Sequence, residues 1–363
     1  MKKDNCGQIM TVRGLVPVSD MGKTITHEHL RFSILHYTEE PTDPKEAEFF
    51  HAPVSLENLY EVRRRPFDNL DNCEQYDIDV ALGEVAYFRD AGGGTICDVS
   101  AEGVCKYDYA KSLVEISERS GVHIVGGIGL FADFDTPDRV KKMTADQVAD
   151  YFIDQIKNGY RDYRSVKPGI IGEMGTGHVI QPGEITRLRG ACRASLETGI
   201  PISVHLQLSA RNGHQVLDVA RQEGLDMDRI ILDHVDTSLS HPDCTYEQGL
   251  DYIRSLAQRG AYVEFDLCGN AEYFPSNQGN WFNPTDMVRA KAIKALCESG
   301  CAERILTSHD AAHKYMLRKW GGWGYSHAIT GFKDVCLWVG VDEKVFDGFS
   351  IDNPRRVLAI REK

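Results

Sequence analysis

The chain has 363 residues, of which 42% are hydrophobic and 26% charged, and a formal net charge of −13. This composition is typical of soluble globular proteins and excludes disordered, collagen-like and low-complexity chains. The acidic balance argues against a broad nucleic-acid interface and disfavours anionic membrane surfaces, because both attract basic patches. We find no signal-peptide pattern and no apolar run near the roughly 18 residues of a membrane span, so we expect a cytoplasmic protein.

Eight short β-branched runs follow one another along the chain, and longer segments with helical spacing of apolar residues lie between them. The runs are Lys23–His27, Thr95–Ser100, Val122–Gly126, Gly169–Glu173, Ile202–Leu206, Arg229–His234, Tyr262–Asp266 and Arg304–Ser308. Alternating β and α segments indicate a parallel sheet covered by helices, and eight such units favour an α/β fold of the (β/α)8 TIM-barrel type. We expect one barrel domain over residues 1–363.

The first run ends in His27 and His29. Side chains alternate along a strand, so both imidazoles share one face, here the barrel interior. Alone, such a pair is more often two hydrogen-bonded core histidines than two metal ligands. About 65 residues then separate the first strand from the second, far more than an ordinary connection. This excursion, residues 31–79, is either a surface feature or a wall of the active site, and the sequence leaves both possibilities open.

Four later strands end in further residues of metal-binding type. Glu173 ends the fourth strand, His205 the fifth and His234 the sixth, and Asp310 follows the eighth. The carboxyl ends of barrel strands meet at one rim, where barrel enzymes have their active sites, so these side chains should converge with the first-strand histidines. Four imidazoles and two carboxylates suit two divalent ions; zinc fits best, with manganese or cobalt as alternatives.

Several motifs together resemble the phosphotriesterase family of the amidohydrolase superfamily, over nearly the whole chain. They include Thr11-Val12-Arg13-Gly14, Thr26-His27-Glu28-His29-Leu30, Gly172-Glu173-Met174-Gly175 and Gly321-Gly322-Trp323-Gly324-Tyr325-Ser326-His327. The last motif looks most like the phosphotriesterase-related branch. Family members are often homodimers, and the resemblance implies the same here.

The resemblance also implies how the ligands divide between two ions. His27, His29 and Asp310 would bind the more buried ion, and His205 and His234 the more exposed one. In organophosphate hydrolases a carbamylated lysine bridges the ions, and its position falls on Gly172 of this chain. The bridging carboxylate expected in the Gly-Glu branch is then Glu173, one residue further on.

The implied reaction is hydrolysis of a small carboxylic ester, lactone or N-acyl amide. Two bridged cations would lower the pKa of a shared water, the resulting hydroxide would attack the carbonyl, and Asp310 would shuttle the proton to the leaving group. Asp236 and Asp266 are expected to support the ligands from behind. The seventh strand ends in Asp266-Leu267, without the histidine that extends the proton relay of organophosphate hydrolases. Phosphotriester hydrolysis is therefore the less favoured alternative.

Substrate contacts are harder to read from the sequence. Basic side chains follow strands five and eight, at Arg211, Lys314 and Arg318, and indicate an anionic small-molecule substrate. Tyr325 and His327 lie in the glycine-rich loop after strand eight and are candidates for hydrogen bonds to it. The alternative is that the basic residues form a solvated first turn of a helix.

Two alternative functions belong to other functional classes. One is a metal-binding barrel without turnover, which the retained Asp310 disfavours. The other is an aldolase or isomerase that uses a Schiff-base lysine. That chemistry needs an interior strand lysine near the rim, whereas Lys23 stands at the opposite end of the first strand.

Overall fold

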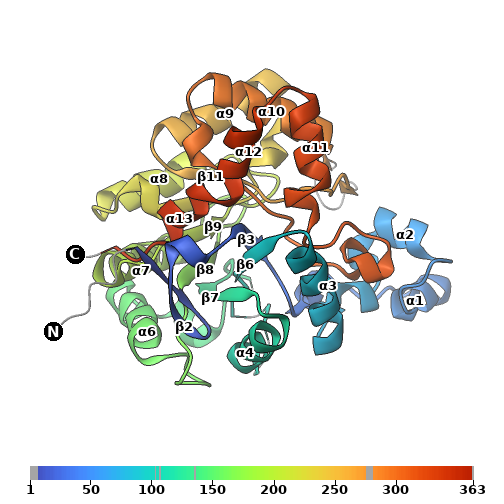
Figure 1. The fold of residues 1–363 in the computed structure, drawn as a ribbon. Helices are drawn as coiled ribbons and strands as arrows, with labels where there is room; N and C mark the ends of the chain where they lie inside the picture. The colour runs from blue at the N-terminus through green and yellow to red at the C-terminus, as the bar shows by residue number, and fades with distance from the viewer. Residues whose placement is uncertain (1–6, 103, 106–107, 135, 275–280, 362–363) are drawn as a thin grey trace.

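The computed structural model describes residues 7–102, 104–105, 108–134, 136–274 and 281–361. Its central sheet has eight parallel strands: β3 (Lys23–Glu28), β6 (Gly93–Asp98), β7 (His123–Leu130), β8 (Ile170–Gly175), β9 (Ile202–His205), β10 (Ile230–Leu232), β11 (Tyr262–Phe265) and β14 (Ile305–Thr307). Each strand pairs with the next in chain order. The outer strands β3 and β14 adjoin where the Asp310 backbone N–H donates to the His27 carbonyl, at 3.2 Å. The predicted TIM barrel is therefore confirmed (Figure 1).

Helices surround this sheet. The barrel helices are α3 (Ile78–Asp90), α4 (Tyr109–Ser120), α6 (Ala145–Asn158), α7 (Pro182–Thr198), α8 (Gly213–Gln222), α9 (Tyr246–Gln258) and α10 (Asp286–Glu298), followed after β14 by α11 (Gly331–Trp338), α12 (Glu343–Ser350) and α13 (Asp352–Leu358); α5 (Asp138–Lys141) is a short turn. Helix α6 illustrates how the sequence sets these elements. Thr144 and Gln147 form a capping box at its start, Gly159 ends it with a φ of 94°, and Val148 and Phe152 bury its apolar face.

The long excursion after β3 contains α1 (Pro44–His51), α2 (Leu59–Arg64) and the short paired strands β4 (Phe32–Ser33) and β5 (Glu74–Gln75). Helices α1 and α2 project at one side of the barrel (Figure 1). Polar contacts tie the excursion to the loop after β14: the Asn72 side-chain amide lies 3.0 Å from His313 Nδ1, and Arg63 donates to the Gly321 carbonyl at 2.7 Å. The excursion is therefore docked on the rim of the barrel.

Two β-bulges lie at the ends of strands that carry predicted ligands. From Ile25 to Glu28 the chain of β3 takes three steps, while the paired residues of β6 take two. From Ile171 to Met174 strand β8 likewise takes three steps against two on β9. An extra residue bends a strand and re-aims its side chains. The bulge in β8 accounts for the one-residue offset by which Glu173, rather than Gly172, faces the cluster.

Strand β7, between β6 and β8, has glycines beside the bulge of β8. A Cβ on Gly129 would lie 2.2 Å from the Glu173 carbonyl oxygen, and one on Gly127 would lie 2.5 Å from the Gly172 carbonyl oxygen. Because neither glycine has a side chain, the Glu173 N–H can reach across β7 to the Val99 carbonyl, at 2.7 Å. The glycine pattern of β7 therefore positions Glu173.

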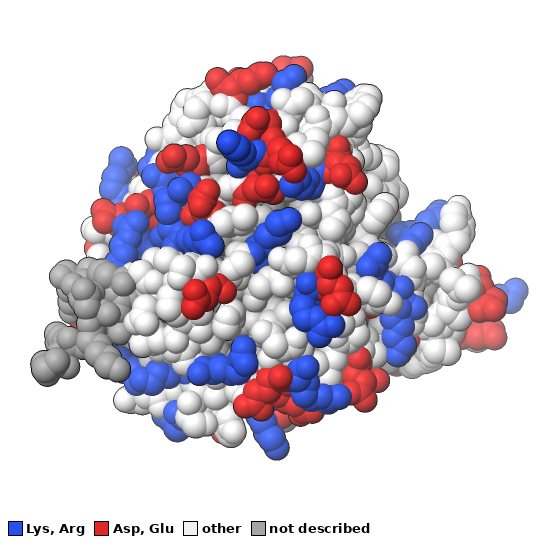
Figure 2. Space-filling model, viewed as in Figure 1, with Lys and Arg blue, Asp and Glu red and all other residues white. Residues whose placement is uncertain are grey.

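The opposite end of the barrel is closed. A hairpin of β1 (Gln8–Thr11) and β2 (Gly14–Pro17) packs with α13 around an apolar cluster that includes Ile9, Met21, Ile231 and Leu306. Basic and acidic side chains are interspersed over the face shown in Figure 2. Among the described residues, no helix combines the length and apolar character that crossing a membrane requires.

Candidate metal centre

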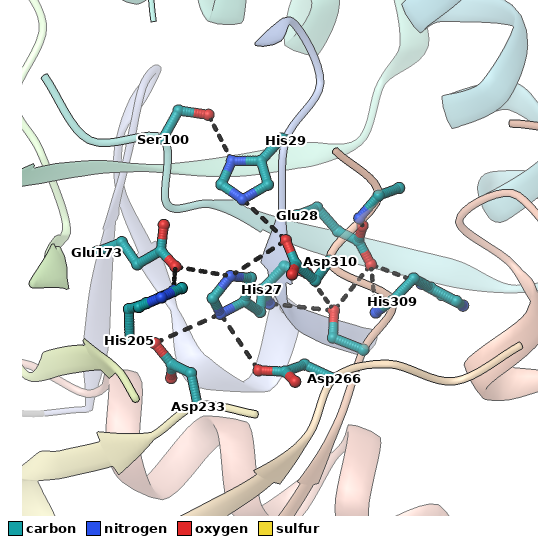
Figure 3. Close-up of polar contacts among 12 residues, drawn as sticks. His27, Glu28, His29, Ser100, Glu173, His205, Asp233, Asp266, His309 and Asp310 are labelled. Carbon is teal, nitrogen blue, oxygen red and sulfur yellow. Dashed lines mark hydrogen bonds and ion pairs between the residues drawn. The ribbon is translucent and has the colours of Figure 1, made fainter. Parts of the chain in front are cut away.

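The six predicted ligands meet at the carboxyl ends of the barrel strands. Figure 3 shows His27, His29, Glu173, His205 and Asp310 among them. On one side, His29 Nε2 lies 3.1 Å from Asp310 Oδ1, and His27 Nε2 lies 3.7 Å from the same oxygen. His27, His29 and Asp310 thus form one group whose ligand atoms lie within 4.8 Å of one another.

The second group consists of Glu173, His205 and His234. Glu173 Oε1 lies 2.7 Å from His205 Nδ1 and 3.5 Å from His234 Nε2. The same oxygen is 3.6 Å from His27 Nε2, so Glu173 lies between the two groups. This is the position that a carboxylate shared by two ions requires.

The donor atoms fit divalent cations. Both ring nitrogens of His27 and Nε2 of His205 are buried and make no hydrogen bond within the described part of the chain. A buried polar atom without a partner costs about 1–3 kcal/mol, a cost that a bound cation removes. Imidazole nitrogens with carboxylate oxygens are the ligand set of zinc and similar first-row ions.

Residues behind the cluster orient its imidazoles. His29 Nδ1 lies 2.9 Å from the Ser100 hydroxyl, and His234 Nδ1 lies 3.0 Å from Asp266 Oδ1. Each contact occupies Nδ1 and leaves Nε2 facing the cluster, the usual arrangement behind metal-bound histidines. Asp266 thus lies where the sequence predicted a supporting residue.

Asp233 and Glu264, which the sequence analysis did not single out, form an acidic layer with Asp266 around His27. Asp233 Oδ2 and Asp266 Oδ2 each lie 3.5 Å from His27 Nδ1. Glu264 accepts a hydrogen bond from Thr26. Burial, followed by the charges of Asp266 and Asp233, raises the pKa of Glu264 well above its ordinary value, so this residue adds little negative charge. In the sequence, the position of Asp233 directly before the predicted ligand His234 could have indicated its place beside the cluster.

Two of the predicted ligands have unusual backbone conformations. His234 has a φ of 58° and Asp310 a φ of 48°, in the left-handed region that favours glycine. Hydrogen bonds hold both: the His234 N–H donates to the two Asp266 oxygens at 3.1 and 3.0 Å, and the Asp310 N–H donates to His27. Such conformations cost about 1–3 kcal/mol each and persist where the surroundings fix them, most often at functional sites.

Glu28, between the two first-strand histidines, anchors the loop that carries Asp310. Its Oε1 accepts from the Ser308 hydroxyl at 2.8 Å and from the His309 backbone N–H at 3.0 Å, and lies 2.5 Å from His309 Nδ1 (Figure 3). His309 Nε2 accepts from the Ala328 N–H at 2.7 Å. Glu28 and His309 thus act on the site through the backbone of the loop.

The electrostatics of the site keep the carboxylates of Asp310 and Glu173 ionised. Burial alone would raise the pKa of Asp310, but the hydrogen bond from His29 and the charges of His234 and His27 outweigh it, so the pKa lies below the ordinary value. For Glu173, burial is likewise outweighed, chiefly by His205, and the pKa falls well below the ordinary value. Both groups are therefore available to a cation.

A cavity of about 280 Å³ opens onto Glu173, His205 and Asp310. Its walls are largely aromatic and apolar: Ile34, His36, Tyr37, Phe67, Val104, Phe131, Leu208, Leu267, Ala312 and Met316. The excursion contributes the first four of these residues. Of the two interpretations that the sequence left open, the structure therefore supports a wall of the site.

The five residues expected to bind an anionic substrate do not line this cavity. Arg211 is exposed, Lys314 pairs with Asp71 at 2.6 Å, and the Arg318 guanidinium lies 4.5 Å from the centre of the Tyr87 ring. The buried Tyr325 hydroxyl donates to the His29 carbonyl at 2.9 Å, and His327 Nε2 lies 2.6 Å from Asp286. The loop after β14 turns Lys314, Arg318 and His327 toward the excursion, α3 and α10, which argues against a basic substrate site at this cavity.

Asp236, expected to support the ligands, instead pairs with Arg289, at 2.5 Å between Oδ2 and Nε. Arg289 also lies 3.2 Å from Asp286, the partner of His327. Asp236 and His327 are thus the two ends of one polar chain behind the site. Burial raises the pKa of Asp236 to about 6.

Comparisons with known proteins agree with this geometry. The sequence model of the phosphotriesterase family matches residues 7–358. A Homo sapiens protein named N-acetyltaurine hydrolase is 29% identical over 357 residues, which cover 98% of this chain and 99% of that protein. The crystal structure of a resiniferatoxin-binding protein from Rhodobacter sphaeroides has a TM-score of 0.91 and 34% identity, covering 98% and 97% of the two chains. A lactonase from Listeria monocytogenes shares the fold, with a TM-score of 0.75 and 22% identity over 98% of this chain and 100% of that one.

Proposed function

The chain belongs to the phosphotriesterase family and is a hydrolase, and from this premise we propose that it cleaves an ester, lactone or N-acyl amide with the help of two divalent cations. Zinc is the proposed metal, with manganese or cobalt as alternatives, and a homodimer is the proposed assembly. The relatives named N-acetyltaurine hydrolase support the amide bond as a target.

The observation that carries the proposal is the convergence of six side chains of metal-binding type beside one cavity, among them His27 and His205, which have buried ring nitrogens without a hydrogen-bond partner in the described structure. His27, His29 and Asp310 would hold one ion, His205 and His234 the other, and Glu173 would contact both. When bound, such ions polarise a carbonyl and lower the pKa of water, the chemistry that hydrolysis at neutral pH requires.

In this proposal, the proton transfer is assigned to Asp310. It lines the cavity, and 18% of its side chain is exposed, whereas the side chains of His27 and Glu173 are 0% and 4% exposed. Its carboxylate can accept the proton of the attacking water and return it to the leaving oxygen or nitrogen, as a general base and then a general acid. The apolar walls limit the access of other water to the same carbonyl.

We expect Asp310→Asn to lower kcat by about 100-fold or more, because the amide cannot carry the proton. The wild type would first be screened on aryl esters, lactones, N-acyl amines and N-acetyltaurine, and the best substrate would then be used for the variant, with bound metal measured in the same preparation. Arg221→Ala, on the exposed face of α8, is the matched control and should keep wild-type turnover. Near-normal turnover by a metal-loaded Asp310→Asn variant would exclude the shuttle role.

A further inference from the structure

Three polar residues between β11 and α10 meet at the wall of the cavity. Asn270 Oδ1 accepts from the Glu272 backbone N–H and from the Asn283 side-chain amide, each at 3.0 Å. Asn270 Nδ2 in turn donates to Glu272 Oε2 at 3.3 Å, and the Asn283 N–H donates to the Glu272 carbonyl at 2.8 Å. All three residues line the cavity, so the protein orders this group before any ligand arrives.

Two acceptor oxygens of the group have no partner. Glu272 Oε1 and Asn283 Oδ1 are buried and make no hydrogen bond in the described structure, although their residues are only 8% and 3% exposed. Leaving a buried acceptor unpaired is costly, and here two such acceptors occur in one network on one cavity. A ligand that brings a hydrogen-bond donor would satisfy them.

The surroundings disfavour an acid group at this place. No lysine or arginine is among the described residues that line this cavity, and the wall formed by the excursion carries the rings of His36, Tyr37 and Phe67. Arg63, Arg64 and Arg65 line the adjoining larger cavity instead. Ring faces attract cations and accept neutral groups, but not anions. Burial, with a further contribution from the charge of Asp310, raises the pKa of Glu272 to about 8, so the ionised carboxylate is costly here unless a donor or a cation meets it.

We propose that Glu272 and Asn283 form a specificity site for the end of the substrate remote from the cleaved bond, and that this end carries an O–H or N–H donor rather than an acid group. The inference rests on the proposed function for the cleaved bond and deepens it by naming the substrate class. It also replaces the anionic substrate expected from the sequence. Glu272 lines the adjoining cavity of about 800 Å³ as well, so a long substrate can continue past this site toward Trp323.

The test is calorimetric binding of four small probes to the metal-loaded enzyme. 2-Phenylethanol is compared with its methyl ether, and 2-phenylethylammonium with its trimethylammonium analogue, so that each pair differs in the donor. We expect each donor probe to bind about tenfold more tightly than its partner, the effect of one or two buried hydrogen bonds. Glu272→Ala and Asn283→Ala should each remove most of this preference.

Two further variants sharpen the result. Glu272→Gln keeps an acceptor but cannot ionise, so it should retain the preference for the alcohol and lose most of that for the ammonium. It also carries the test if Glu272→Ala does not fold. Gln207→Ala, on another wall of the same cavity, should keep both preferences.

Equal binding within both probe pairs in the wild type, or preferences that survive Glu272→Ala and Asn283→Ala, would overturn the inference. Because binding is measured without turnover, an enzyme that shows the donor preference but hydrolyses none of the screened substrates would contradict the proposed function and leave this site supported.

Discussion

At the residue scale, the site depends on how each imidazole is held from behind. Asp266 accepts from both the backbone N–H and the ring of His234, and so fixes a residue whose backbone is in the left-handed region. Ser100 has a similar relation to His29, through a single hydroxyl. These outer contacts decide which ring nitrogen faces the cluster, and therefore which is free to bind a cation.

Replacing Asp266 by asparagine should accordingly weaken metal binding. The amide keeps one oxygen within reach of both the His234 N–H and its ring, but it lacks the negative charge that strengthens the contact with the ring, so we expect a fall of about 10- to 100-fold in affinity. Competition with a chromogenic chelator measures this. Asp236→Asn is the matched control at the same end of the barrel: it breaks the pair with Arg289 and should lower stability more than metal affinity. Equal metal affinities of the wild type and Asp266→Asn would refute the supporting role.

The convergence of the six candidate ligands could be predicted from the sequence, because each stands at the end of a recognisable strand and all such ends meet at one rim. Glu28 could not, since its role depends on the loop after β14, 280 residues away in the sequence. The basic residues after β14 misled the sequence analysis for a related reason. Side-chain direction in that loop is set by contacts such as Lys314 with Asp71, which join segments that no local pattern connects.

At the scale of elements, the site requires irregular strands. The alternation of β-branched runs with helical segments in the sequence predicted all eight barrel strands. It could not predict the bulges in β3 and β8, because a bulge is visible only in the register between two paired strands. The glycines of β7 act together with the bulge of β8. Gly129 allows the backbone of Glu173 to approach where a side chain would collide with it.

We therefore expect Gly129→Ala to destabilise the fold by about 1–3 kcal/mol, since a new methyl group would meet the Glu173 backbone and force a shift. The control is Gly83→Ala in α3, where a Cβ meets nothing within 4 Å; there the better helix propensity of alanine should stabilise by up to about 1 kcal/mol. Denaturant unfolding measures both. If Gly129→Ala unfolds at the wild-type denaturant concentration, the close approach of β7 and β8 is not required.

The docking of the excursion gives a prediction about pH. His313 is buried against Phe67 and accepts from Asn72, and burial lowers its pKa from 6.5 to about 4. Between pH 6.5 and pH 4 the unfolded chain binds a proton on His313 and the folded chain does not. The free energy of unfolding therefore has its full value above pH 6.5 and decreases as the pH falls toward 4. Between pH 7 and pH 5 the wild type should lose about 2 kcal/mol more unfolding free energy than His313→Asn. Parallel losses in the two proteins would contradict this.

At the scale of the whole molecule, the barrel is sealed at one end and open at the other. The β1–β2 hairpin and α13 close the amino-terminal end with apolar side chains, while the excursion and the loops after β11 and β14 surround the opposite rim. Chain length and the count of β and α segments were sufficient to predict this architecture. The shape of the cavity was not predictable, because its walls come from segments far apart in the sequence.

Metal content per chain is the measurement that decides whether this rim is a metal centre. Elemental analysis would be made on the purified wild type and on Glu173→Ala, each after reconstitution with zinc, manganese or cobalt, with circular dichroism as the check on folding. We expect about two ions per chain in the wild type and fewer in the folded variant, because Glu173 lies between both ligand groups. Fewer than one ion per reconstituted wild-type chain would contradict the two-ion centre and the function built on it.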